Sequence, residues 1–298
     1  MGRSLRSVVT VFISIFVVCS ASWMFLRSNA ISKPLKPAFA HTFNEIHRAG
    51  SPALFLQFQT IADDQSSALA ELSELAERAQ SATGSGLWLD IRLVRTGELV
   101  ISASDQLRNG KPVELASIEE CLAQGLVTLK EAAPVLKETF VTLNLIARRP
   151  GLPTKLFEVW GEGKLLPLDR TLVQSESDGI LKELREQAPK AFFGSSQATL
   201  IQLEMLSTLG LQGLSDLKAD ALVSLIEEPA KRDGAASMIP RLRDSTLAEA
   251  HRRGLKRYAG PVRTREAAKE LQAAGYDGII LTERGIWEDL LDERHLLQ

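Results

Sequence analysis

The chain has 298 residues, and 35 Lys and Arg nearly balance 37 Asp and Glu, which leaves a formal net charge of -2 at pH 7. This balance argues against a polyanion-binding surface, so we expect no nucleic-acid partner. The two cysteines, Cys19 and Cys121, are too few for a disulfide framework, and the four histidines lack the spacing of zinc ligands.

The first predicted element is an apolar run from Val8 to Leu26 that contains no charged residue. A helix rises about 1.5 Å per residue, so this run would cross most of a hydrocarbon core of about 30 Å. Trp23, near its end, suits the membrane interface. We expect residues 1–34 to form a membrane anchor and a linker, with the following domain exported. The alternative is a signal peptide cleaved near Ser20-Ala21-Ser22, which would release a secreted domain.

Residues 35–298 show short apolar strands that alternate with amphipathic helices, which is the pattern of a parallel sheet. A capping box at Thr128–Glu131 marks the start of one helix, and another helix is predicted at about 217–226. The strands are predicted at 53–58, 87–93 with a short companion at 98–102, 140–146, 191–193, 210–214, 236–239, 255–259 and 277–281.

Eight such units predict an α/β fold, a (β/α)8 barrel of the TIM type. An open doubly wound sheet is the alternative, but the Gly-x-Gly-x-x-Gly turn typical of that fold is absent from the sequence.

Six segments of the sequence contain motifs that can be compared, in order and spacing, with those of known families. They are Gly86-Leu87-Trp88-Leu89-Asp90-Ile91-Arg92-Leu93, Thr96-Gly97-Glu98-Leu99-Val100-Ile101, Leu126-Val127-Thr128-Leu129-Lys130-Glu131, Gly194-Ser195-Ser196, Ala250-His251-Arg252-Arg253-Gly254-Leu255-Lys256 and Leu271-Gln272-Ala273-Ala274-Gly275-Tyr276-Asp277-Gly278-Ile279-Ile280-Leu281-Thr282-Glu283. In this order and spacing they resemble the glycerophosphodiester phosphodiesterase family over about residues 52 to 292. The resemblance implies a TIM barrel that cleaves phosphodiesters with two histidines and a divalent metal held by carboxylates.

The chain departs from that family at most of the catalytic positions. The first strand should end in His-Arg-Gly, the second should carry Glu-x-Asp followed by His-Asp, and the third should offer Glu-x-Lys. The missing histidines and glutamates are replaced by Gln57, Trp88, Ser104 and Ile146. This comparison predicts that no residue of the chain is a confident catalytic group.

Two carboxylates and one cation remain at family positions, namely Asp90, Asp105 and Arg148, and we expect them to contact a ligand. Asp90 is a weak metal ligand by itself, because Mg²⁺ and Ca²⁺ usually take several oxygen ligands. The guanidinium of Arg148 suits phosphate oxygens. In the alternative interpretation, the two aspartates only cap strand ends or pair with Arg92, Arg95 and Arg108.

The histidines fit structural roles better than catalytic ones. His47 precedes the first strand, in a stretch that predicts a short helix with Phe43 and Ile46 facing the barrel, and His41 lies in the same stretch. His251 lies inside a predicted helix.

These observations predict a membrane-tethered pseudoenzyme without a cofactor, which contacts the membrane through residues 8–26 and binds a glycerophosphodiester, a lipid head group or a protein partner. One alternative is a divergent phosphoric diester hydrolase that uses Mg²⁺ or Ca²⁺. Its replacement carboxylates would come from Glu45, Asp63, Asp64, Glu158 or Asp169. The other alternative is an interaction scaffold whose binding surface lies on the excursion from Pro150 to Arg170.

Overall fold

The computed structural model describes residues 15–26, 42–47, 51–60, 62–146, 151–161, 166–189, 191–211, 214–215, 217–226 and 242–295. Its centre is a sheet of eight parallel strands. In chain order they are β1 (Ala53–Gln57), β2 (Ser85–Leu93), β5 (Val141–Leu145), β6 (Thr171–Ser175), β7 (Phe192–Phe193), β8 (Ala221–Leu225), β9 (Lys256–Val262) and β10 (Gly278–Leu281). The strands pair in the order β7-β6-β5-β2-β1-β10-β9-β8.

The two ends of this sheet meet at β7 and β8. Gly194 and Ala221 form a parallel bridge there, and the Asp220 N–H donates to the Phe193 carbonyl at 2.8 Å. The sheet therefore closes into a barrel, and the predicted (β/α)8 fold is confirmed. Two short antiparallel strands, β3 (Leu99–Ile101) and β4 (Val127–Thr128), extend β2 beyond the barrel.

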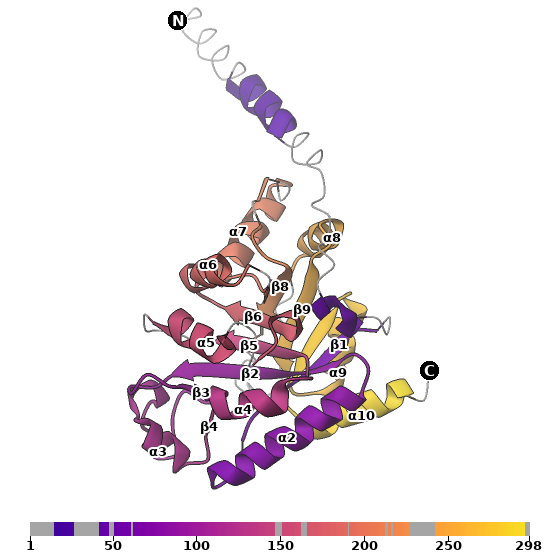
Figure 1. Ribbon diagram of the computed structural model, residues 1–298. Coiled ribbons are helices and arrows are strands. Elements are labelled where there is room, and N and C mark those ends of the chain that lie inside the picture. Colours follow the sequence, from indigo (N-terminus) through magenta and orange to yellow (C-terminus); the bar gives the residue numbers. More distant parts are fainter. Residues whose placement is uncertain are drawn as a thin grey trace, which may run out of the picture.

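Helices cover the outside of the barrel (Figure 1). They are α2 (Gln65–Ser81), α3 (Ile118–Leu122), α4 (Leu129–Leu136), α5 (Leu152–Trp160), α6 (Asp178–Gln187), α7 (Gln197–Thr208), α8 (Asp244–Arg252), α9 (Arg265–Ala273) and α10 (Arg284–His295). The predicted capping box is present, because the Thr128 hydroxyl accepts from the Glu131 N–H and the Glu131 carboxylate accepts from the Thr128 N–H.

Side chains along the strands point alternately outward and inward, and they form two separate apolar layers. Leu54 and Leu56 of β1 pack outward against the helices, whereas Ala53 and Phe55 pack inside the barrel. The short 3-10 helix η1 (Thr42–His47) fills the amino-terminal end of the barrel, where the Phe43 ring stacks on Phe192 with centroids 5.1 Å apart. Phe43 and Ile46 are both buried, which confirms that they face the barrel.

Two predicted strands differ from the structure, although the total of eight is right. The fourth strand is Thr171–Ser175, which lies in a long connection for which no strand was predicted. The sixth strand is Ala221–Leu225, which lies in a segment predicted as a helix. Short apolar runs suit a helix and a strand equally, and here barrel closure selected the strand. The predicted strand at 210–214 is wrong for the described part of that range, and 236–239 lies outside the described residues.

Residues 15–26 of the predicted anchor form a helix that projects from the barrel beyond α7 and α8 (Figure 1). Residues 8–14 lie outside the described part of the chain. In the described residues we find no helix with the length and apolar character needed to cross a bilayer.

Candidate functional site

Four adjacent strands each place one polar side chain inside the barrel near its carboxyl end: Gln57 from β1, Asp90 from β2, Asn144 from β5 and Gln174 from β6. The strand register sets Asp90 beside Asn144, and Asn144 beside Gln174. Catalytic residues of TIM barrels come from this end. The polar layer is therefore the first candidate site.

Asp90 is the centre of this layer, and its carboxylate accepts hydrogen bonds from three neutral donors. Gln57 Nε2 donates to Oδ2 at 2.7 Å, while Asn144 Nδ2 and Trp88 Nε1 donate to Oδ1 at 2.7 Å and 3.0 Å. The aspartate is 3% exposed. Both oxygens are thus occupied by groups of the chain itself.

Burial raises the pKa of Asp90 above its ordinary value, because the charged form loses its hydration. The hydrogen bonds from Asn144, Gln57 and Trp88 oppose this shift, as does the charge of Arg92. Arg92 donates from Nε to the Ser102 carbonyl at 3.2 Å. These donors hold the carboxyl group of Asp90 in place inside the barrel.

The residues of this layer do not fit the divalent metal that the family resemblance implies. Mg²⁺ and Ca²⁺ need several oxygen ligands with lone pairs free to bind. Asp90 already accepts three hydrogen bonds from the chain itself, and Trp88, which is 1% exposed, fills the neighbouring space inside the barrel. The part of the chain that the structure describes contains no cluster of three His, Cys, Asp or Glu able to hold a metal.

A cavity of about 720 Å³ opens above this layer at the carboxyl ends of the strands. Its walls come from the end of β1, the loop after β3 and the ends of β8, β9 and β10. The described residues that line it are Gln57, Phe58, Gln59, Thr60, Ile101, Ser102, Ala103, Ser104, Gln106, Leu107, Arg108, Gln124, Leu126, Ile226, Pro261, Arg263 and Thr282. This lining holds two arginines, several amides and hydroxyls, and no acidic side chain. Such a surface suits an anion better than a cation.

The predicted site residues are only partly brought together. Ser104 lines the cavity, where its hydroxyl donates to the Gln106 carbonyl at 2.8 Å. Asp105 is exposed and lies outside the cavity lining. Ile146 follows β5, and its N–H donates to the Ile91 carbonyl at 3.0 Å. Arg148 lies outside the described residues.

The described contacts of Arg108 and Asp90 bear on the alternative interpretation of the two aspartates. Arg108 pairs with Asp63 at 2.6 Å and donates to the Ala62 carbonyl. Asp90 is held by neutral donors, although Arg92 lies close enough for its charge to act on the Asp90 pKa.

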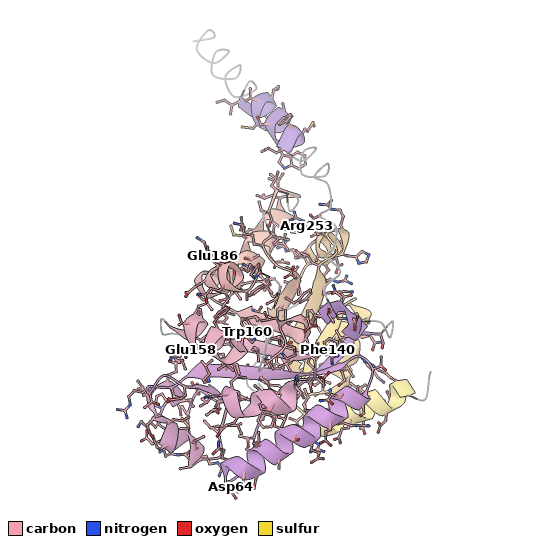
Figure 2. The ribbon with its side chains drawn as sticks, viewed as in Figure 1. Asp64, Phe140, Glu158, Trp160, Glu186 and Arg253 are labelled. Carbon is pink, nitrogen blue, oxygen red and sulfur yellow. The ribbon has the colours of Figure 1, made fainter. Side chains whose placement is uncertain are left out.

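The carboxylates that could replace the lost glutamates are not among the described residues that line the cavity. Asp64 caps α2 through the Ser67 N–H, and Glu158 pairs with Lys155 on α5, so both lie outside the barrel (Figure 2). Asp63 is exposed beside Arg108. Glu45 belongs to η1, and Asp169 belongs to η4 (Leu168–Arg170), which contacts η1 at the amino-terminal end.

His47 lies at the end of the barrel opposite the cavity. Its Nε2 is 2.7 Å from the hydroxyl of Tyr258, near the start of β9. Burial, followed by the charge of Lys256, lowers the pKa of His47 to about 4, against the opposing charge of Asp277. His251 is exposed on α8, and His41 lies outside the described residues. The expectation that His47 is structural agrees with this position.

Asn144, Gln174 and Arg263 were not among the predicted site residues. The alternation in β5 carried a signal for the first of these, because polar Thr142 and Asn144 fall between apolar Val141, Leu143 and Leu145. Only the register of the closed barrel shows that Asn144 faces Asp90.

No protein-family model and no curated protein matches the sequence. Solved structures do resemble it. A glycerophosphodiester phosphodiesterase from Parabacteroides distasonis aligns with a TM-score of 0.57 and 15% identity, over 82% of this chain and 98% of that one. An Oleispira antarctica phosphodiesterase in complex with the product sn-glycerol-3-phosphate aligns with a TM-score of 0.56 and 16% identity, over 84% of this chain and 98% of that one. A glycerophosphoryl diester phosphodiesterase domain from Mycobacterium tuberculosis aligns with a TM-score of 0.58 and 14% identity, over 83% of this chain and 100% of that one. The chain therefore has the barrel fold of the glycerophosphodiester phosphodiesterases.

Proposed function

We propose that this chain is a membrane-tethered binding protein that takes the anionic head of a phosphodiester into its barrel cavity without hydrolysing it. The observation that carries the proposal is the closed set of hydrogen bonds around Asp90. Hydrolysis of a phosphodiester needs a cation for the developing charge and a group that transfers protons. Gln57, Trp88 and Asn144 use both oxygens of the carboxylate that would have to serve such a cation.

The lining of the cavity supports an anionic ligand. Arg263 supplies positive charge, and guanidinium groups match the geometry of phosphate oxygens. The second arginine of the lining, Arg108, already pairs with Asp63 at 2.6 Å. Thr282 adds a hydroxyl whose oxygen is buried and has no hydrogen-bond partner in the structure. A ligand oxygen in the cavity would satisfy this group. The glycerol phosphate in the Oleispira antarctica structure suggests the chemical class of the ligand.

The tether is proposed from the uncharged run of residues 8–26, of which 15–26 form an exposed helix. We propose that the barrel is exported and stays attached to the outer face of the membrane through this run. A phosphodiester head group of a lipid would then lie within reach of the cavity.

Calorimetry on the purified full chain tests the proposed binding. Glycerophosphoglycerol and glycerophosphocholine should release or take up heat on binding, and Arg263→Gln and Thr282→Val should weaken both. Arg284→Gln is the matched control, because Arg284 pairs with Glu74 and Glu288 on the outside of the barrel. Absence of binding by either compound would contradict the proposal.

A hydrolysis assay separates this proposal from the divergent phosphoric diester hydrolase. The chain is incubated with glycerophosphodiesters and Mg²⁺, Ca²⁺ or Mn²⁺, and the release of glycerol phosphate is measured. We expect no turnover. A metal-dependent turnover that Asp90→Asn abolishes would establish the enzyme and end the pseudoenzyme proposal.

A further inference from the structure

The outward face of α7 carries a row of exposed apolar side chains. Ile201, Met205 and Leu209, four residues apart, are 54%, 66% and 57% exposed, and we call this set the α7 stripe. Residues at this spacing lie above one another on one side of a helix. The other exposed residues of α7 are Gln197, Ala198, Gln202 and Thr208, which are uncharged, and the partly exposed Glu204 pairs with Arg243.

The barrel does not use this face of the helix. Leu203 and Ser207, on the opposite side of α7, are buried and attach the helix to the barrel. By contrast, the exposed faces of the barrel helices α2 and α9 carry charges, such as Glu74 and Lys269. Contiguous exposed apolar side chains in a folded protein mark a surface that binds something.

The α7 stripe continues into the N-terminal helix. The indole Nε1 of Trp23 donates to the Leu209 carbonyl at 3.3 Å, so the end of the stripe and the end of residues 15–26 are adjacent. Phe16, Met24 and Phe25 of the N-terminal helix are 72%, 65% and 69% exposed. Both elements lie at the same end of the molecule (Figure 1).

We infer that the α7 stripe inserts into the surface of a phospholipid bilayer beside the N-terminal helix and thereby fixes how the barrel sits on the membrane. This inference rests on the proposed tether and does not depend on the ligand of the cavity. Apolar side chains with an adjacent tryptophan match the boundary between acyl chains and head groups.

The size of the stripe argues against a second copy of the chain as its occupant. A stable protein interface buries roughly 800 Å² on each partner, which is 20 to 30 residues a side. Three side chains on one helix are far too few for this, whereas a bilayer already held by the N-terminal helix needs only a shallow contact.

Site-specific fluorescence on the full chain tests the inference. In a Cys19→Ser background, which leaves only buried Cys121, Met205→Cys is labelled with an environment-sensitive fluorophore. Lys269→Cys is the matched control, on an exposed position of α9 away from the N-terminal helix (Figure 1). Vesicles of phosphatidylcholine and phosphatidylglycerol should shift the emission at position 205 to the blue and leave position 269 unchanged.

Two further results bear on the same question. Replacing all three stripe residues with Gln should leave the chain on the vesicles through its N-terminal helix. It should abolish the blue shift of a fluorophore at Thr208→Cys, an exposed position of α7, because apolar area is no longer transferred from water. The triple variant should still bind glycerophosphodiesters, which keeps this test separate from that of the cavity. The inference fails if the label at position 205 stays in water on vesicles to which the chain is bound. It also fails if that label is shielded before vesicles are added in a concentration-dependent way, because a second copy would then cover the stripe.

Discussion

The indole of Trp88 donates a hydrogen bond to the carboxylate of Asp90, two residues later on the same strand, at 3.0 Å. In the family that the sequence resembles, these two positions carry a glutamate and an aspartate. Here the first has become a donor to the second. Two neighbouring carboxylates repel each other unless a cation or a shared proton lies between them, whereas the indole N–H of Trp88 attracts the carboxylate.

Removing the Asp90 carboxylate should destabilise the barrel. Asp90→Ala leaves the indole N–H of Trp88 and the amide of Asn144 without their acceptor, and unpaired buried donors cost about 1–3 kcal/mol. Urea unfolding at pH 7 measures this loss. Asp90→Asn, which keeps an acceptor, should lose less, and exposed Asp105→Ala should stay within about 0.5 kcal/mol of the parent chain. An Asp90→Ala variant as stable as the parent would show that the hydrogen bonds contribute nothing.

The hydrogen bond from Trp88 should matter more than an equivalent bond to a neutral acceptor. Trp88→Phe removes a donor to a carboxylate, which typically contributes about 1.5–3 kcal/mol, against about 0.5–1.5 kcal/mol for neutral partners. Trp287→Phe is the matched control, since its buried indole donates to the Leu54 carbonyl at 3.3 Å. We expect a larger loss in unfolding free energy for Trp88→Phe. Equal losses would mean that Asp90 is not ionised in the folded chain.

Burial of His47 should make the fold less stable in acid. Its pKa is lowered to about 4 in the folded chain, from 6.5, so the unfolded chain takes up the proton first. The unfolding free energy therefore falls as the pH drops from about 6.5 to about 4, by about 3 kcal/mol at most. Unfolding of the parent chain and His47→Gln is compared at each pH. The difference between them should change over this window, while exposed His251→Gln should follow the parent.

Gly278 allows Tyr258 to occupy the amino-terminal end of the barrel beside His47. A Cβ at this position would lie 2.1 Å from Cδ1 of the Tyr258 ring, which is fully buried and cannot retreat cheaply. Gly278→Ala should cost about 1–3 kcal/mol, the usual range for overpacking. Gly285→Ala in α10 is the control, because nothing lies within 4 Å of its Cβ and alanine favours a helix. Thermal unfolding that ranks Gly278→Ala level with Gly285→Ala would contradict the contact.

Local sequence patterns were enough to predict the alternating strands and helices and the capping box at Thr128. They also carried the resemblance that pointed to a phosphodiesterase barrel, and the fold agrees. Patterns of this kind are local, because the period of apolar residues and the caps of helices depend on neighbours along the chain. The same locality explains why the strands at 171–175 and within 217–226 were not predicted, because a short apolar run is compatible with either a helix or a strand.

The tertiary structure alone decided what surrounds Asp90. The sequence offered Asp90, Asp105 and Arg148 as one group. The pairing of β2 with β1 and β5 instead brings Gln57 and Asn144 to Asp90, beside Trp88 of the same strand, and Asp105 lies outside the cavity lining. Asn144 lies 54 residues from Asp90, and only the parallel register of β2 and β5 makes them neighbours. Contacts between strands depend on the register and closure of the whole sheet, which no single segment contains.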